Sequence, residues 1–218
     1  MHIILSQRID IKSDYEDKPF IRYHFPKRYR SQINSGDLFI YNQGNRHNEK
    51  HRYYFGCGSI GKIWEADQKD HYFAEIDNPK RFSKKVGIKK SNGETYLESI
   101  DYQDVRENAH PPFRSSIRKI SNAAYEEIIS LAGGYFIIDR RSVGDLIIKA
   151  LNQNSGSADI ITICRYVWNN YEMDLRQSGE FFYSWQYDIR WAATKLREEN
   201  ILKPAEFSPK GIWELVEE

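Results

Sequence analysis

The sequence predicts an α+β protein in which a small, partly closed β-barrel with flanking helices is followed by a helical domain. Short runs rich in β-branched and aromatic residues fill the first 132 residues and are bounded by turn signals such as Ser35-Gly36-Asp37. Helical spacing of apolar residues dominates the remainder. With 218 residues, 40% of them hydrophobic, the chain is long enough to bury a core. We therefore expect two domains, 1–132 and 139–218.

The strands of the first domain are expected at 2–5, 38–41, 53–64, 71–76 and 85–88. A turn is expected at 78–82, and Ser91-Asn92-Gly93 has the composition of a hairpin turn. Ser121 is a suitable N-cap for a helix that reaches Leu131 and ends at Gly133-Gly134. Few helices and several short strands favour a small barrel.

The second domain is expected to contain three helices, at 143–151, 158–171 and 184–200, the last with Ser184 as its N-cap. Two short strands then bracket a turn at 208–211. Trp191 and Trp213 are expected in the core. Three helices followed by a hairpin is the element order of a winged helix.

Three glycines, Gly56, Gly58 and Gly61, interrupt the expected strand 53–64. A glycine inside a strand marks a bulge, a bend or a close approach by a ligand or another backbone. Two interpretations stay open at this point: the glycines let a barrel curl, or this strand and the loop before it form the rim of a binding pocket.

Composition narrows the class of protein. No apolar run approaches the roughly 20 residues that span a bilayer, and the first residues lack a signal-peptide pattern. Cys57 and Cys164 are the only cysteines, and their spacing is not that of a metal site. We expect a cytoplasmic protein with no membrane partner, whose cysteines are small buried side chains.

Positive charge is concentrated in one stretch, although the net charge of the chain is only +1. Between residues 17 and 62 there are nine Lys or Arg residues against three acids. Aromatic and basic residues alternate from Arg22 to Arg30. Cations hold phosphates and aromatic faces stack on bases, so the stretch suits nucleic acid. An ordinary solvated surface is the alternative.

No pattern indicates catalysis. His47 and His51 lack a Cys or carboxylate that would complete a metal site. Glu75, Asp77 and Lys80 are residues that a nuclease would use, but they lie within the strand pattern. We expect no enzymatic activity, no cofactor and no metal.

The first domain resembles the PUA-like superfamily, in particular the EVE and YTH-type readers attached to bacterial restriction nucleases. The resemblance is carried by 23–29 (YHFPKRY), 35–44 (SGDLFIYNQG) and 54–67 (YFGCGSIGKIWEAD), followed by 71–76 and 113–121. It implies a modified base flipped into an aromatic pocket of Tyr41, Asn42, Gln43, Gly56, Cys57 and Trp64. It also implies backbone contacts from the basic residues Arg22, Lys27, Arg28, Arg30, Arg46, Lys50, Arg52, Arg114 and Arg118.

The second domain is similar to the winged-helix domains of Mrr-type restriction proteins, through 188–202 (DIRWAATKLREENIL) and 210–217 (KGIWELVE). Such domains place the third helix in the major groove. The resemblance implies contacts from Ser184, Gln186, Tyr187, Arg190 and Thr194. From residue 139 onward, however, ten Lys or Arg residues face thirteen acids. Dimerisation or another protein contact is therefore an open alternative for this domain.

These expectations combine into one hypothesis: the chain binds double-stranded DNA that carries a methylated or hydroxymethylated base. It would act as the recognition part of a restriction or defence system, with cleavage supplied by a nuclease partner. Two alternatives stay open, an RNA-binding PUA-like module and a transcriptional regulator that senses a small ligand.

Overall fold

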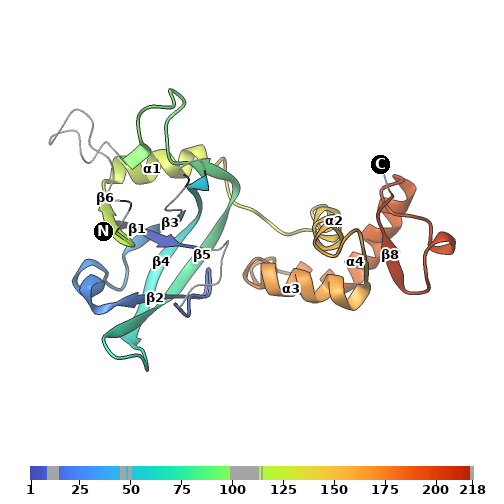
Figure 1. The fold of residues 1–218 in the computed structure, drawn as a ribbon, viewed down its shortest axis with the longest axis horizontal. Helices are drawn as coiled ribbons and strands as arrows, with labels where there is room; N and C mark the ends of the chain where they lie inside the picture. Colours follow the sequence, from blue (N-terminus) through green and yellow to red (C-terminus); the bar gives the residue numbers. More distant parts are fainter. Residues whose placement is uncertain (9–14, 45–47, 49–50, 99–112, 114, 217–218) are drawn as a thin grey trace. The chain divides into compact units, whose positions relative to one another are not determined.

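The computed structural model of the protein describes residues 1–8, 15–44, 48, 51–98, 113 and 115–216. The chain divides into two compact units, Met1–Phe136 and Ile137–Glu218. The first contains a six-stranded sheet with one α-helix, and the second contains three α-helices with a small two-stranded sheet (Figure 1). The prediction of an α+β protein is confirmed.

The sheet of the N-terminal unit is mixed, with the strand order β2-β5-β4-β3-β1-β6. The β1–β3 pairing is parallel, whereas the other four pairings are antiparallel. The strands expected at 2–5, 38–41 and 53–64 are present, whereas those expected at 71–76 and 85–88 are the two ends of one strand. The bounds of the strands are β1 His2–Gln7, β2 Arg22–Pro26, β3 Leu38–Gln43, β4 Tyr53–Glu65, β5 His71–Gly87 and β6 Ile117–Ile120.

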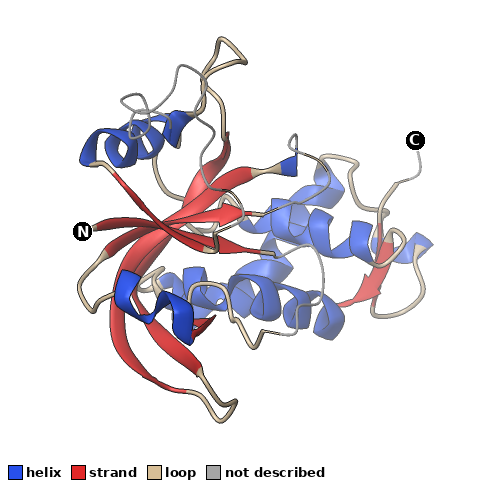
Figure 2. Ribbon diagram, turned by 60° about the vertical axis from the view of Figure 1, so that its left-hand side comes forward, coloured by secondary structure: helices blue, strands red, loops and turns tan. Residues whose placement is uncertain are grey.

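The turn predicted at 78–82 is wrong, because β5 runs continuously through it. Asn78 has a φ of +47° and lies in a bulge, where the pairing with β4 shifts between Ser59↔Asp77 and Cys57↔Lys80. Bulges bend a strand and increase its twist. The long β4–β5 pair is accordingly strongly curved (Figure 2).

Two tyrosines join the opposite edges of the curled sheet. The hydroxyl of Tyr23, on edge strand β2, donates to the carbonyls of Ser6 (3.0 Å) and Ser116 (3.3 Å). Tyr29, in the 3₁₀ helix η1 (Lys27–Gln32), accepts from the Ser116 N–H at 3.0 Å. Side-chain hydrogen bonds, rather than a strand ladder, thus hold the half-barrel curled.

Helix α1 (Asn122–Leu131) covers the other face of this sheet. The Ser121 side chain accepts from the Ala124 N–H, so the predicted N-cap is confirmed. Ala124 and Ile128 of α1 pack with Ile4 and Ile40 of the sheet. This layer gives the sheet one helix-covered face, and the aromatic interior of the curl lies on the other.

The C-terminal unit consists of α2 (Val143–Gln153), β7 (Ser157–Asp159), α3 (Ile160–Arg176), α4 (Phe181–Glu198), the 3₁₀ helix η4 (Ala205–Phe207) and β8 (Ile212–Glu214). Strand β7 pairs with β8, and an isolated bridge joins Leu202 to Leu215. The three predicted helices are confirmed. Of the two strands expected around the turn at 208–211, only the second is present, as β8; it pairs mainly with β7, which was not predicted.

Two predictions for α4 are wrong. The helix begins at Phe181 rather than after Ser184, because the Ser184 hydroxyl donates to Asp188 one turn later (2.7 Å) instead of capping. Trp191 is not core: it is 39% exposed. The core side of α4 consists of Trp185, Ile189 and Leu196 with the alanines between them.

Candidate nucleic-acid interface

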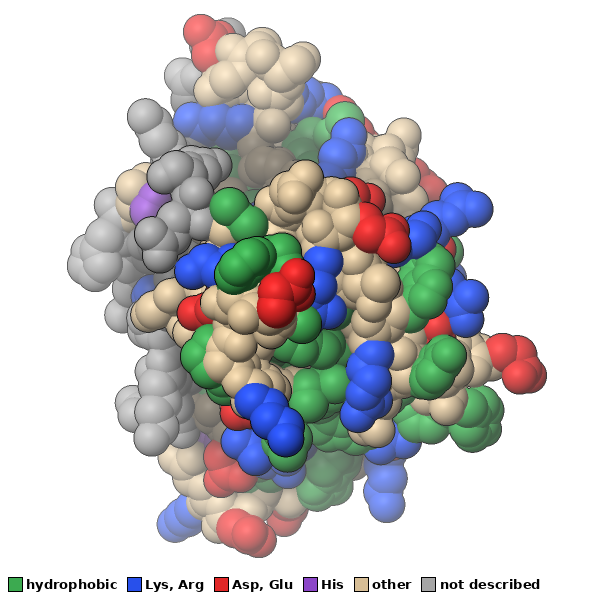
Figure 3. All heavy atoms as spheres, turned by 90° about the vertical axis from the view of Figure 1, so that its right-hand side faces the viewer, with side chains coloured by type: hydrophobic (Ala, Val, Ile, Leu, Met, Phe, Trp, Pro, Cys, Tyr) green, Lys and Arg blue, Asp and Glu red, His purple; other side chains and the backbone are tan. Residues whose placement is uncertain are grey.

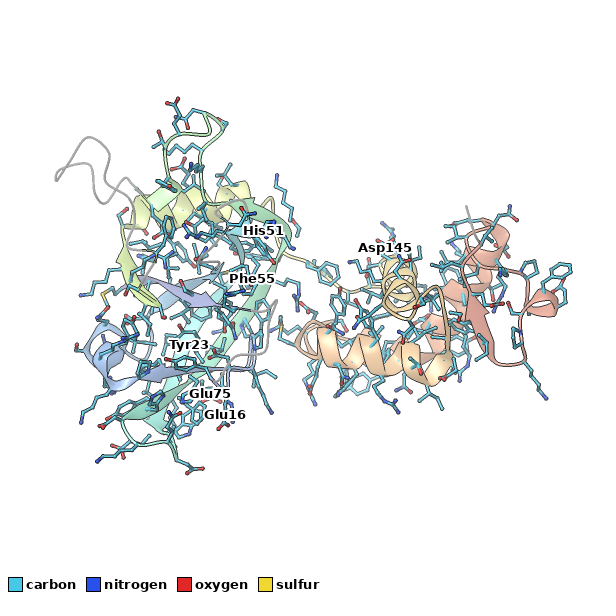
Figure 4. The ribbon with its side chains drawn as sticks, viewed as in Figure 1. Glu16, Tyr23, His51, Phe55, Glu75 and Asp145 are labelled. Carbon is cyan, nitrogen blue, oxygen red and sulfur yellow. The ribbon has the colours of Figure 1, made fainter. Side chains whose placement is uncertain are left out.

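An aromatic cluster surrounds Tyr41 inside the curl of the N-terminal sheet. Tyr41 lies parallel to Phe55 of β4, with ring centroids 5.1 Å apart and an interplanar angle of 6°. Phe20 meets Tyr41 edge-on at 5.2 Å, and its N–H donates to the Tyr41 hydroxyl at 3.3 Å. Figure 4 labels Phe55 and, below it, Tyr23 within this unit. All these rings are buried.

Asn42 belongs to a buried polar cluster on the α1 side of the sheet. Its side-chain oxygen accepts from Arg118 Nη2 at 3.4 Å, and Arg118 forms a two-point ion pair with Glu98. Tyr54 donates to the same carboxylate at 2.6 Å. Burial is the main cause that raises the pKa of Tyr54. Because Arg118 is 3% exposed and neutralised, it lies in the core rather than among surface groups available to phosphate.

Gln43 and Gln7 lie side by side on the Tyr41 face, as partners in the parallel β1–β3 pairing. Both are almost completely buried, at 2% and 4% exposure. Gln43 donates to the Gly44 carbonyl, whereas Gln7 Oε1 accepts no hydrogen bond from the described part of the chain. A buried carbonyl without a donor costs about 1–3 kcal/mol, so this position calls for an explanation.

The structure brings only some of the expected pocket residues together. Gly56 lies opposite Tyr41 in the β3–β4 pairing, and Phe20 packs against it. Cys57 belongs to the α1-side core, where burial raises the pKa of its thiol. Trp64 lies near the far end of β4, is 37% exposed and contacts Phe73. Tyr41, Gln43 and Gly56 therefore share one face, while Asn42, Cys57 and Trp64 lie elsewhere.

Four arginines of the expected backbone surface lie over aromatic rings. Arg22 lies over Phe73 (4.5 Å) and Arg28 over Tyr29 (4.9 Å). Arg30 lies over Tyr72 at 5.9 Å and Arg52 over Phe113 at 4.7 Å. Lys27 is exposed and contacts Asp70. The remaining members of the set, Arg46, Lys50 and Arg114, lie outside the described residues.

A titratable cluster lies beside this basic surface. The Glu16 N–H donates to His24 Nδ1 (3.0 Å), so His24 carries its proton on Nε2, which faces His71 Nδ1 at 3.2 Å. Burial, together with His71, lowers the pKa of His24. Burial raises the pKa of Asp17 to about 6, against the opposing effect of the His24 N–H that it accepts. The lowered pKa of His24 keeps its imidazole neutral near pH 7.

Helix α4 presents a solvent-facing surface of aromatic, basic and polar side chains. Tyr183 is 85% exposed, Tyr187 70% and Trp191 39%. Lys195 lies over the Trp191 ring at 4.3 Å, and Arg140 lies at 5.3 Å from the same ring. We call this surface the α4 face; its members are Tyr183, Gln186, Tyr187, Arg190, Trp191, Thr194 and Lys195. Hydrophobic side chains also lie beside Lys and Arg side chains on the molecular surface drawn in Figure 3.

Asp188 is the single acid between Phe181 and Arg197, and it does not reach the α4 face. Its side chain is 1% exposed and accepts from Arg140 Nε and Ser184 Oγ, each at 2.7 Å. Ser184 is thereby turned inward, unlike the other expected contacts Gln186, Tyr187, Arg190 and Thr194, which are exposed. The α4 face therefore carries positive charge only, within a unit that is acidic overall.

Sequence reasoning missed several residues of these sites. Phe20 and Gln7 carry no motif, and only the chain's curvature brings Phe20 to Gly56. Tyr183 and Trp191 could have been found from the helical spacing of 183, 187 and 191, which places them on one face of a helix.

Among the described residues, no three His, Cys, Asp or Glu side chains are grouped so that they could hold a metal ion. In the same part of the chain, none of the helices combines the length and the apolar character needed to cross a membrane. No model of a known protein family matches this chain, and no curated protein matches it significantly.

Proposed function

We propose that this chain binds duplex DNA through the α4 face and reads a modified base with its N-terminal unit. It would serve as the recognition part of a restriction or defence system, with cleavage supplied by another chain. The observation that carries the proposal is the α4 face, which exposes basic and aromatic side chains and no acid in a unit whose net charge is negative.

The side chains of the α4 face suit a DNA groove. An α-helix fits the major groove, where Arg donates to guanine and Gln pairs with adenine. Arg190 and Gln186 lie one turn apart on the exposed side of α4, and Lys195 adds a cation for phosphate. Strand β8, which follows α4, pairs with β7, which lies between α2 and α3, and an isolated bridge joins Leu215 to Leu202. This order of helices and paired strands supports a winged-helix arrangement.

The curled sheet of the N-terminal unit supports the reader role. A PUA-like reader needs aromatic faces for a flipped base and polar groups for its edge, because a base is read fully only once it leaves the stack. Tyr41, Phe55 and Gln43 supply groups of both kinds on one face of the sheet. Arg22, Lys27 and Arg28 offer cations for the DNA backbone on the same unit.

The test is a binding titration with matched duplexes, unmodified or carrying 5-methylcytosine, 5-hydroxymethylcytosine or N6-methyladenine, at two salt concentrations. We expect salt-dependent binding and at least tenfold preference, about 1.4 kcal/mol, for one modified duplex. Arg190→Ala should weaken binding by about 1–3 kcal/mol. Arg176→Ala removes an exposed arginine that pairs with Glu172 on α3, and serves as the matched control.

Equal affinity for all four duplexes would rule out the reader role for these modifications. Unchanged binding by Arg190→Ala would rule out the α4 face.

RNA binding is a second candidate, because the exposed rings of Tyr183 and Tyr187 could stack on unpaired bases. A single-stranded RNA added to the same titration distinguishes the two, since tighter binding to RNA than to every duplex favours this candidate.

A further inference from the structure

We propose that the Phe20 ring occupies the binding site of a nucleobase. A base of the cytosine or adenine type, which carries an exocyclic amino group, displaces the ring and binds in its place. We call this place the Phe20 seat; its walls are Tyr41, Phe55, Gly56 and Arg81. The inference rests on the proposed reader function. It adds that the Phe20 ring fills the base-binding site when no ligand is bound.

The backbone at Phe20 is strained. Its φ is +65°, in the left-handed region that costs a bulky residue on the order of 1–3 kcal/mol. Elsewhere in the described chain, the non-glycine residues with positive φ are Asp, Asn or Ser, all small and polar, and Asp and Asn tolerate this region better. Phe20 adopts it because its ring is inserted into the sheet. Release of the ring would therefore relieve strain rather than create it.

Strand β4 is shaped to receive a ring. A Cβ on Gly56 would lie 2.5 Å from Cε1 of Phe20, so only glycine permits this close approach. Phe20 meets Tyr41 and Phe55 nearly perpendicularly, at 79° and 84°, and the Arg81 guanidinium lies 4.7 Å from its centroid. Aromatic neighbours and a cation over the ring are also what a nucleobase requires from its binding site.

Polar groups close to the Phe20 seat indicate which base fits. Gln7 lies two residues beyond Leu5, the partner of Tyr41, on the same face of the sheet and about 7 Å further along. Its buried Oε1 accepts no hydrogen bond from the described residues and needs an N–H donor. The exocyclic amino groups of cytosine and adenine are such donors. Thymine has no exocyclic amino group, and its single N–H, at N3, lies between two carbonyl oxygens that would repel Oε1.

Tyr41 provides a second polar group at the seat. Its hydroxyl accepts from the Phe20 N–H at 3.3 Å, a bond that is lost when Phe20 leaves. Burial raises the pKa of Tyr41, so the hydroxyl stays protonated and can donate to a ring nitrogen of the base as well as accept.

The segment that carries Phe20 is a short turn before β2, anchored at its end by the Ile21 carbonyl, which accepts from the Ile76 N–H of β5 at 3.0 Å. Phe20 lies in a short turn closed by backbone hydrogen bonds between Lys18 and Arg22. Its neighbours Pro19 and Ile21 are exposed and contribute little to the core. The ring is thus the buried part of an exposed turn.

The direct test uses Phe20→Gly, which removes the ring and accommodates the positive φ. Binding of 5-methyl-2′-deoxycytidine, N6-methyl-2′-deoxyadenosine and thymidine is measured by calorimetry on the full chain. We expect at least tenfold tighter binding of one amino-bearing nucleoside than in the unsubstituted protein, and no gain for thymidine. Phe25→Ala, which removes another buried ring of the sheet interior, should show no gain. The absence of any gain in Phe20→Gly overturns the proposal.

If Phe20→Gly does not fold, hydrogen exchange of the Phe20 amide in the unsubstituted chain provides an independent test. With saturating nucleoside or modified duplex, the Phe20 amide should exchange at least tenfold faster; unchanged or slower exchange overturns the proposal. The two proposals fail separately. Modified-duplex binding without faster exchange leaves the reader function and removes the seat. A nucleoside gain without duplex binding keeps the seat and removes the DNA function.

Discussion

Arg118 and Glu98 form a two-point ion pair inside the N-terminal unit, with Nε–Oε2 at 2.6 Å and Nη2–Oε1 at 2.7 Å. Their side chains are 2% and 0% exposed. Ser6 and Tyr54 add hydrogen bonds to the guanidinium and to the carboxylate. The pair therefore ties β6 and the segment before residue 98 to β1 and β4.

Removal of one partner should destabilise this unit strongly. Arg118→Met leaves the Glu98 carboxylate buried without its cation, and we expect a loss of about 3–5 kcal/mol in the free energy of unfolding. The measurement is denaturant-dependent hydrogen exchange of β3 and β4 amides in the full chain. Lys27→Met, which breaks the exposed Lys27–Asp70 pair, should leave the exchange profile nearly unchanged. Equal effects would show that Glu98 is not held as a buried charge.

Asp17→Asn should stabilise the protein near neutral pH. The folded-state pKa of Asp17, raised by burial to about 6, lies above its ordinary 3.8, so stability falls as the pH rises from 3.8 to about 6 and stays reduced above that. Asparagine keeps the acceptor for the His24 N–H without the charge. We expect a gain of about 2–3 kcal/mol at pH 7.5 that disappears near pH 3, because the carboxyl of the unfolded chain is then protonated too.

Chemical denaturation of Asp17→Asn and of the unsubstituted chain at both pH values checks this prediction. The opposite pH dependence of His24, whose pKa is lowered by burial, occurs in both proteins and cancels in the difference. A stability difference that is the same at both pH values would contradict the assignment to Asp17.

Local signals predicted the fold where local energetics decide it. The α1 helix could be placed because the Ser121 cap and the apolar spacing act within one or two turns. Asn78-Pro79 looked like a turn, yet the pairing with β4 absorbs the extra residues as a bulge in β5. Likewise, serine is a common N-cap residue, but the Ser184 hydroxyl donates a hydrogen bond to the Asp188 carboxylate inside the helix.

The candidate sites depend on contacts between residues far apart in the sequence, and these are not visible in a motif. Gly56 could be singled out as unusual within a strand, but its partner Phe20 could not, because the curl of the sheet brings the two together. The resemblance placed Tyr41 and Trp64 in one pocket, whereas they lie on different parts of the sheet. The net charge of −3 for the second domain gave no indication of the basic α4 face. A charge count does not distinguish a buried acid such as Asp188 from exposed basic residues.

Gly56→Ala should be strongly destabilising. Its Cβ would lie 2.5 Å from the Phe20 ring and 2.8 Å from the Lys80 carbonyl oxygen, so both a side chain and the backbone of β5 must shift. We expect a loss of about 1–3 kcal/mol, as for overpacking in a core. Gly87→Ala, also in a strand but with no atom within 4 Å, is the matched control and should be neutral or slightly stabilising.

Thermal denaturation of the full chain measures these losses, and the double variant Gly56→Ala/Phe20→Gly separates the two contacts in the same experiment. Removal of the ring leaves only the clash with Lys80, so the alanine should destabilise less in this background than in the unsubstituted chain. An identical effect in both backgrounds would show that Phe20 does not press on Gly56.

Lys195→Gln should lower the salt dependence of DNA binding. Lys195 lies over Trp191 on the α4 face, and a lysine that contacts phosphate contributes about one unit to the slope of log K against log salt concentration. Lys149→Gln on α2 is the matched control, because Lys149 is also exposed and lies over an aromatic ring, Tyr171. Titrations at four salt concentrations give the slopes. A slope that falls equally in both variants would mean that charge acts through the whole unit, whereas a fall confined to Lys195→Gln assigns the phosphate contact to α4.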